Sequence, residues 1–229
     1  MELGLDSFKI PSGEITNLPY LRHVGQYGKP VILSTGMSTL SEIETALNIL
    51  ERVGTSRERI TVLHCNTEYP TPMSDVNLNA MLTIRDKLGV KVGYSDHTLG
   101  IEISIAAVAL GASVIEKHFT LNTNDTGPDH PHSMDANEFK RMVGYVRDLE
   151  AAMGTTSKVV VEEEAETVIV QRRGLYSTKF IPKGKVIDKG DLVELRPALG
   201  IAPKYKEVII GRVASRDIEA DSPIQWKDL

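Results

Sequence analysis

Short apolar runs alternate with longer segments of helical periodicity over roughly the first 150 residues of the chain. Strand-like runs recur at residues 8–12, 31–35, 60–65, 91–95 and 114–118. The clearest helical segment between them covers residues 39–52, where Thr39 and Glu42 can form a capping box. Gly54 ends this helix, and a later helical segment covers residues 135–154. Such a succession of strand–helix units is typical of a parallel β-sheet.

Polar residues stand at the carboxyl end of every one of these strands. They are Lys9, Ser12 and Glu14; Ser34 and Thr35; His64, Asn66 and Thr67; Ser95, Asp96 and His97; and Glu116, Lys117 and His118. An open doubly wound sheet gathers its ligand groups near one switch point, whereas a barrel draws them from many strand ends. The pattern therefore favours a barrel. Because a TIM barrel has eight strands, we expect an α/β fold that holds the C-terminal five βα units of a TIM barrel and lacks the first three.

Two histidines, His97 and His118, end neighbouring strands joined by a helical segment between Gly100 and Gly111. A right-handed crossover would make these strands parallel neighbours and place both imidazoles at one sheet edge. A lone histidine at a strand end is usually a satisfied core residue, but two together favour a metal site. Two imidazoles leave positions for water and a substrate oxygen, which suits an open octahedral ion better than a closed zinc site. We therefore expect a divalent metal, Mn²⁺ with Mg²⁺ or Co²⁺ as alternatives.

Three further groups near these strand ends have more than one interpretation. Asp96 is either a carboxylate behind the metal ligands or a cap of the helix that follows Gly100. His130 and His132 are spaced as metal ligands could be, but a flexible surface pair is the simpler interpretation. We therefore leave these two histidines out of the predicted site.

The pattern changes after Gly154. We expect a partial TIM-barrel domain over residues 1–155, a charged linker over residues 156–169 and a small β-rich domain over residues 170–229. The last domain contains an internal repeat, since residues 181–192 align with residues 218–229 through Ile, Ile, Asp and Leu at equal spacing. Two similar units predict a small pseudo-symmetric β fold. Its core would be small, so it should pack against the barrel or a partner subunit.

Composition excludes several classes of function. The 229 residues carry a net charge of −5 and no basic run, so nucleic acid is not an expected partner. No stretch reaches the roughly 18 apolar residues of a membrane span, and the N-terminus lacks a signal-peptide pattern. The single cysteine, Cys65, cannot form an intrachain disulfide, which agrees with a reducing compartment. We therefore expect a cytoplasmic protein with no membrane partner.

Several short motifs occur in an order that is typical of one family. They are residues 8–14 (FKIPSGE), 32–37 (ILSTGM), 64–72 (HCNTEYPTP), 93–98 (GYSDHT), 116–120 (EKHFT), 127–130 (GPDH) and 195–197 (LRP). In this order they resemble the bacterial sialic acid synthase family. Its members join a TIM barrel to a C-terminal antifreeze-like (type III, SAF) domain and condense phosphoenolpyruvate with N-acetylmannosamine or a related 2-acetamido sugar. The first three barrel strands of the family, which carry an acid/base glutamate and phosphate-binding groups, have no counterpart here.

The resemblance implies roles for the polar residues at the strand ends. Phosphoenolpyruvate would be held by Lys9, Ser12, Ser34, Thr67 and Ser95. The sugar would be oriented by Glu14, Tyr69, Asp129 and Arg196, with Glu14 counted beside His97 and His118 as a catalytic group. Taken singly, serines and threonines usually cap turns, Glu14 could form a salt bridge, and Tyr69 could pack its proline-rich turn. Arg196 would reach the acetamido group in a neighbouring barrel, which implies a domain-swapped homodimer.

The expected reaction is an aldol-type condensation. C3 of phosphoenolpyruvate attacks the sugar aldehyde, and a metal polarises the carbonyl of that aldehyde. Water then adds at C2 and phosphate departs, so that the product is a nine-carbon 2-keto acid. The alternatives are another metal-dependent barrel aldolase or hydrolase, and a non-catalytic carbohydrate-binding fragment. Because part of the barrel is missing, we expect the 229-residue chain alone to be inactive or nearly so and to associate through its open sheet edge. The sequence leaves open N-acetylmannosamine or a 6-deoxy-2,4-diacetamido hexose as the sugar.

Overall fold

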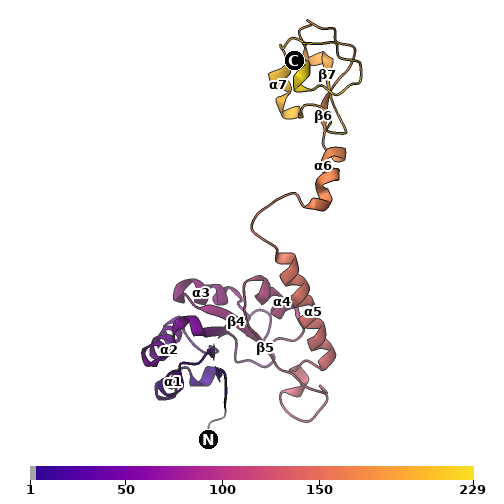
Figure 1. The fold of residues 1–229 in the computed structure, drawn as a ribbon. Coiled ribbons are helices and arrows are strands. Elements are labelled where there is room, and N and C mark those ends of the chain that lie inside the picture. Colours follow the sequence, from indigo (N-terminus) through magenta and orange to yellow (C-terminus); the bar gives the residue numbers. More distant parts are fainter. Residues whose placement is uncertain (1–3) are drawn as a thin grey trace. The chain divides into compact units, whose positions relative to one another are not determined.

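The computed structural model describes residues 4–229, which fold into two compact units. The first unit ends at Gly154 and the second begins at Thr155. The first unit contains one parallel sheet, of which Figure 1 labels β4 and β5, and its strand order is β1-β2-β3-β4-β5. Its strands are β1 (Phe8–Ile10), β2 (Val31–Ser34), β3 (Ile60–His64), β4 (Lys91–Asp96) and β5 (Ile115–Lys117). These strands confirm the predicted ones, with ends that differ by at most two residues.

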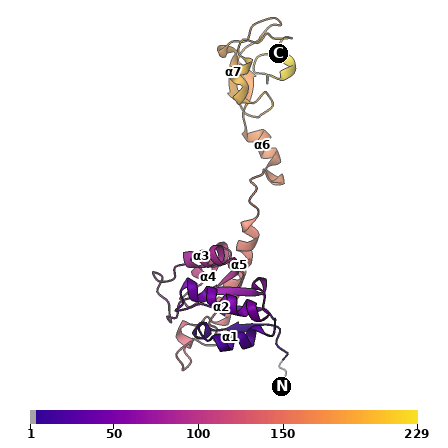
Figure 2. The ribbon, with the colours of Figure 1, turned by 90° about the vertical axis from the view of Figure 1, so that its left-hand side faces the viewer.

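Helices join consecutive strands of this sheet. They are α1 (Leu18–Gly25), α2 (Leu40–Val53), α3 (Asn79–Leu88) and α4 (Glu102–Ala109), and α5 (Ala136–Met153) follows β5. Each crossover leads to the adjacent strand, and right-handed crossovers repeated in one direction place every helix on the same face. A second view shows α1, α2 and α3 stacked in chain order (Figure 2). This singly wound order is that of a barrel wall and confirms the predicted part of a TIM barrel.

The core of the first unit lies between the sheet and these helices, and α2 shows how the sequence builds it. The Glu42 amide donates to Thr39 Oγ1, and the Thr39 amide donates to the Glu42 carboxylate at 2.7 Å. The predicted capping box is therefore confirmed. Farther along the helix, Ile43, Leu47 and Leu50 are at most 3% exposed and belong to one buried cluster with the strands. Their spacing gives α2 the apolar face that packs on the sheet.

The second unit is built around a small antiparallel sheet of β6 (Gly174–Ser177) and β7 (Leu192–Leu195). Two short helices accompany it, α6 (Ala165–Gln171) and α7 (Lys206–Ile209). Part of the segment predicted as a charged linker is therefore helical. Among the helices of residues 4–229, none has the length and hydropathy that crossing a membrane requires.

The internal repeat of the second unit is visible in its hydrogen bonds. Ile181 and Ile218, which start the two copies, pair with each other in an antiparallel bridge. Each copy ends in a 3₁₀ turn with a buried aspartate, Asp191 or Asp228. Each of these carboxylates accepts the amide three residues before it, at 3.0 and 2.7 Å. The equal positions of the two caps confirm the predicted pseudo-symmetry.

Candidate functional site

The side chains of β4 and β5 alternate between the two faces of the sheet, and this alternation sorts their polar residues. Ser95 and His97 share one face at the end of β4, and Glu116 and His118 share the same face at the end of β5. Asp96 and Lys117, which lie between the members of each pair, point to the opposite face. The first set of side chains forms a polar cluster, and Asp96 and Lys117 form a separate buried ion pair.

The buried ion pair joins Asp96 to Lys117 on the helix side of the sheet. Lys117 Nζ lies 3.0 Å from Asp96 Oδ2, and the two side chains are 1% and 0% exposed. Lys117 also donates to the Thr98 carbonyl at 2.6 Å, while Ser104 on α4 donates to Asp96 at 2.6 Å. Because α4 is capped at Ile101, Asp96 is not its cap. Asp96 instead ties β4 to β5 and α4, which differs from both predicted roles.

A chain of polar contacts crosses the inner face of the sheet. Lys9 Nζ on β1 lies 3.1 Å from Glu116 Oε2 on β5. Ser95 Oγ donates to Glu116 Oε1 at 3.0 Å and lies 3.4 Å from His97 Nε2. Lys9 and Ser95, both predicted site residues, therefore meet at one carboxylate, and His97, a third, lies next to Ser95. Since β1 and β5 are the outermost strands, this meeting requires a strongly curved sheet.

His97 is held in a form suited to metal binding. Its Nδ1 donates to the Asn66 carbonyl at 2.6 Å, an arrangement that assigns the proton to Nδ1 and leaves the Nε2 lone pair free. Burial lowers the pKa of His97 below its usual 6.5, although the Asn66 carbonyl acts in the opposite direction. A neutral imidazole with one bonded and one free nitrogen is the usual state of a histidine ligand.

Three imidazoles surround the ring of Tyr69. Its centroid lies 4.3 Å from that of His97, 5.6 Å from that of His118 and 5.7 Å from that of His132. The Thr71 amide donates to the His97 carbonyl at 2.9 Å, which fixes the turn that carries Tyr69. Partial burial, followed by nearby acidic groups, raises the pKa of Tyr69, so its hydroxyl keeps its proton.

The loop after β5 folds back onto the strand that precedes it. The Met134 amide donates to the His118 carbonyl at 2.9 Å, and the Thr120 amide donates to the Met134 carbonyl at the same distance. This return brings Asp129 close to two histidines. Its carboxylate oxygens lie 4.0 Å from His118 Nδ1 and 3.7 Å from His132 Nε2.

These donors fit a divalent metal. Ligand atoms of His118, Asp129 and His132 lie within 4.8 Å of one another. His97 lies beside this group, with its ring centroid 5.2 Å from that of His118. Imidazoles and a carboxylate are ligands that divalent first-row metals accept. The cluster can therefore hold such an ion.

The predicted hydroxyl groups gather at the ends of β1, β2 and β3. Ser12 Oγ accepts the Gly36 amide at 2.9 Å. A Cβ at Gly36 would collide with Thr67 Oγ1 and lie 3.0 Å from Ser12 Oγ, so the three residues are closely packed. Ser34 is 3% exposed, and its Oγ has no hydrogen-bond partner within residues 4–229. Buried hydroxyls are usually hydrogen-bonded, so Ser34 is available to a ligand.

Two predicted residues make local contacts. Glu14 accepts a hydrogen bond from the Asn17 side chain at 2.6 Å, in place of the salt bridge considered as the alternative. Arg196 is exposed in the second unit, where its Nε donates to the Gln171 carbonyl at 2.7 Å. The roles of Glu14 and Arg196 toward a sugar stay predictions.

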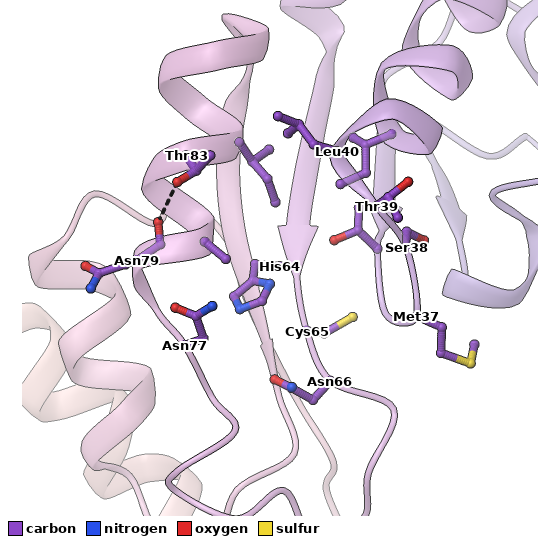
Figure 3. Close-up of a pocket in the computed structure, with 14 residues that line it drawn as sticks. Met37, Ser38, Thr39, Leu40, His64, Cys65, Asn66, Asn77, Asn79 and Thr83 are labelled. Atoms are coloured by element: carbon purple, nitrogen blue, oxygen red, sulfur yellow. Dashed lines mark hydrogen bonds between the residues drawn. The ribbon is translucent and has the colours of Figure 1, made fainter.

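A cavity of about 560 Å³ opens beside this cluster, between the N-terminal ends of α2 and α3. Its wall includes Met37, His64 and Asn77 (Figure 3). Cys65 and Asn66 connect the cavity to the polar cluster, since Cys65 Sγ lies 3.4 Å from Ser12 Oγ and the Asn66 carbonyl holds His97. The predicted site residues do not line it. The cavity therefore adjoins the cluster without containing it.

Sequence reasoning left three members of the cluster out of the predicted site. Glu116 had a usable signal, because it stands two residues before His118 and so faces the same way. Asn66 acts through its backbone carbonyl, which no side-chain pattern reveals. The prediction of a flexible surface pair is wrong for His132, which is 8% exposed. Its burial follows from the return of the loop to β5.

Comparison with known proteins identifies relatives of both units. The NeuB family matches residues 1–158, and the SAF domain matches residues 172–229. The N,N'-diacetyllegionaminic acid synthase of Campylobacter jejuni is 49% identical over 98% of this chain and 67% of its own length. The protein of the same name from Legionella pneumophila is 42% identical over 100% of this chain and 65% of its own length.

A solved structure gives the same relationship. The N-acetylneuraminic acid (sialic acid) synthetase of Leptospira borgpetersenii, in complex with citrate, superposes with a TM-score of 0.66 at 35% identity. The match covers 72% of this chain and 57% of that one. The chain spans about two thirds of the length of the curated relatives that it matches.

Proposed function

The chain belongs to the NeuB family and carries a SAF domain, and on this premise we propose that it takes part in the condensation of phosphoenolpyruvate with an N-acetylated amino sugar. The products are a nine-carbon 2-keto acid of the sialic acid type and inorganic phosphate. One observation carries the proposal: Lys9 and Ser95 meet at Glu116 on the carboxyl edge of the sheet, with His97 next to Ser95. The Lys9 ammonium and the Ser95 hydroxyl can bind a phosphorylated acid. The imidazoles beside them can bind a metal.

Phosphoenolpyruvate would lie over the ends of β1, β2 and β4. Its binding groups are Lys9, Ser12, Ser34, Thr67 and Ser95. Lys9 exchanges the Glu116 carboxylate for the more highly charged phosphate of the ligand. The unpartnered hydroxyl of Ser34 gains a hydrogen bond in the same step. Without ligand, Glu116 keeps Lys9 and Ser95 on the inner face of the sheet.

The imidazoles of His97 and His118 would hold a divalent metal, Mn²⁺ with Mg²⁺ or Co²⁺ as alternatives. When bound, such a metal polarises the carbonyl of a sugar aldehyde. Tyr69 borders both rings and Asp129 lies beside His118, so these two residues would orient the open-chain sugar. Glu14, at the end of β1, would bind its hydroxyls and join the two histidines as a catalytic group.

The reaction consumes one water molecule besides the two substrates. The C2=C3 double bond of phosphoenolpyruvate supplies the electron pair for a bond from C3 to the aldehyde carbon, and the aldehyde oxygen takes up a proton. Water adds at C2 and releases a proton in turn, and the bond between C2 and the phosphate oxygen breaks to leave the 2-keto acid and inorganic phosphate. The task of the protein is to hold the two carbons within bonding reach and to keep other nucleophiles away from C2.

The names of two relatives support one class of sugar. Both are N,N'-diacetyllegionaminic acid synthases, at 49% and 42% identity. We therefore favour a 6-deoxy-2,4-diacetamido hexose over N-acetylmannosamine. Arg196 would bind an acetamido group in the barrel of a partner subunit, as part of a domain-swapped homodimer. The single, buried and free Cys65 supports a cytoplasmic location for this activity.

Phosphate release tests the proposal. The assay combines phosphoenolpyruvate, Mn²⁺ and either sugar with two proteins, the 229-residue chain and a form completed to eight βα units. We expect release by the completed form, faster with the diacetamido sugar, and little release by the 229-residue chain. Because a metal contributes several kcal/mol, His97→Ala and His118→Ala should each reduce the rate to roughly a hundredth or less. Equal rates after chelation, or unchanged rates in both variants, contradict the mechanism.

A further inference from the structure

His132 is a buried histidine that the proposed reaction leaves without a role. Its side chain is 7% exposed, and its Nε2 is buried with no hydrogen-bond partner among the residues that the structure describes. Buried polar nitrogens are usually paired, so an unpaired one calls for a missing partner. The nearest charged group is Asp129, whose Oδ1 lies 3.7 Å from Nε2, beyond hydrogen-bond range.

The backbone places His132 beside His118, one of the two histidines proposed to hold the metal. The hydrogen bonds of Met134 with His118 and Thr120 fix the returning segment against the end of β5. His132 belongs to a 3₁₀ turn just before this contact, and Ser133 Oγ donates to the Asp129 carbonyl at 2.7 Å to close the turn. The placement of His132 therefore follows from main-chain pairing and does not depend on one rotamer.

The direction of the ring agrees with this placement. The centroid of His132 lies 5.2 Å from that of His118 and 5.7 Å from that of Tyr69, on which His97 also packs. Its ligand atom lies within 4.8 Å of those of His118 and Asp129. By contrast, His130 in the same turn uses its Nδ1 to bond Thr120 Oγ1 at 2.6 Å.

From burial, the unpaired nitrogen and this convergence, we infer that His132 supplies a third imidazole to the metal centre of His97 and His118. The inference rests on the proposed function only for the presence of a metal. A third nitrogen ligand changes the metal preference, because imidazole favours later first-row ions whereas oxygen ligands favour Mn²⁺ and Mg²⁺. The chain should therefore bind Co²⁺ more tightly than Mn²⁺, and His132 should account for much of that difference.

The test measures Mn²⁺ and Co²⁺ binding to the 229-residue chain by calorimetry, without phosphoenolpyruvate or sugar. Two variants remove the nitrogen: His132→Asn, and His132→Phe, which keeps a ring beside His118. The matched control is His130→Asn, which changes a histidine of the same turn and retains a polar group for Thr120. Thermal unfolding of each metal-free variant checks that it is folded.

Both His132 variants should bind Mn²⁺ about tenfold more weakly or worse, with a larger loss for Co²⁺, while His130→Asn stays within about twofold of the parent chain. Spin-echo modulation from protein with ¹⁵N-labelled histidine should count three imidazole nitrogens on Mn²⁺ in the parent and two in His132→Phe. Two nitrogens in both proteins, or unchanged affinity, would overturn the inference, as would the absence of any metal binding by the parent.

These outcomes separate the inference from the proposed function. If metal affinity depends on His132 but no sugar supports phosphate release, the inference stands and the proposed reaction fails. If phosphate release requires His97 and His118 but metal affinity is unchanged in the His132 variants, the reaction stands and the inference fails.

Discussion

Lys9 on β1 and Glu116 on β5 form an ion pair of 3.1 Å between the two outermost strands of the sheet. In a flat sheet, four strand spacings of about 4.8 Å would keep these strands about 19 Å apart. The long side chains can meet only because the sheet curls toward its inner face, as the wall of a barrel does. Curvature thus turns residues from opposite edges into neighbours in one site.

This pair predicts a competition between Glu116 and an anionic ligand. Glu116→Gln removes the negative charge that pairs with Lys9, so phosphoenolpyruvate should bind more tightly to this variant. Lys9→Met removes the cation and should weaken phosphoenolpyruvate binding by about tenfold or more. Calorimetric titration of phosphoenolpyruvate into the metal-free chain measures both effects. Weaker binding by Glu116→Gln would show that the carboxylate helps to hold the ligand and would contradict the competition.

The pair of Asp96 and Lys117 should behave differently, because both side chains are buried. Lys117→Met leaves Asp96 as an uncompensated buried charge and should reduce the free energy of unfolding by about 3–5 kcal/mol. Lys9→Met is the matched control, since its pair is partly exposed and should contribute less than about 1 kcal/mol. Urea unfolding followed by the helical circular dichroism signal compares them. Equal losses would mean that burial of the pair does not matter.

The pKa of His97 predicts a pH dependence in the metal-free protein. Burial favours the neutral ring, so the folded pKa lies below the unfolded value of about 6.5. Between these two pKa values the unfolded chain binds more protons than the folded chain does. The neutral His97 ring therefore contributes to stability above about pH 6.5, and this contribution is lost as the pH falls through the folded pKa. Imidazole NMR, assigned with His97→Gln, should give a midpoint below 6.5. A midpoint at or above 6.5 would refute the prediction.

Asp191 predicts a second pH dependence, in the second unit. Burial raises its pKa, but the Asp188 amide and the ammonium groups of Lys185 and Lys179 outweigh burial and lower the pKa to about 2. Since the unfolded value is about 3.8, the stability that this carboxylate contributes is present above pH 3.8 and is lost as pH falls toward 2. Asp191→Asn should therefore destabilise the unit at pH 7 by about 1–3 kcal/mol and much less at pH 2.

The fluorescence of Trp226, the single tryptophan of the chain, reports unfolding of this unit. Glu207→Gln, an exposed change on α7, is the control and should stay within about 0.5 kcal/mol of the parent at both pH values. A loss that is the same at pH 7 and pH 2 would mean that the charge of Asp191 is not responsible.

Gly36 predicts a steric test of the hydroxyl cluster. Gly36→Ala places a methyl group against Thr67 Oγ1 and 3.0 Å from Ser12 Oγ, so both hydroxyls must move. Phosphoenolpyruvate affinity should fall by about tenfold, while Gly144→Ala, where a Cβ meets no atom within 4 Å, should leave it unchanged. An unaltered affinity in Gly36→Ala would remove Ser12 and Thr67 from the binding site.

Local patterns determined most of the fold. The apolar runs specify β2, β3 and β4 because these strands bury residues on both faces. The Thr39 capping box and Gly54 specify the bounds of α2 through hydrogen bonds between near neighbours. The family also followed from the sequence, since the resemblance to sialic acid synthases is confirmed by the NeuB match. Period-2 alternation similarly put Ser95 and His97 on one face.

Only the tertiary structure decided which of these polar residues meet. The contact of Lys9 with Glu116 depends on sheet curvature, and the burial of His132 depends on the return of a loop from Thr120 to Met134. Glu116 and Lys117 are adjacent in sequence but lie on opposite faces of the sheet. Which of them joins the polar cluster depends on which strand face turns toward the barrel interior and which toward α4. Contacts between distant residues depend on the packing of the whole unit, and no short stretch of sequence contains that information.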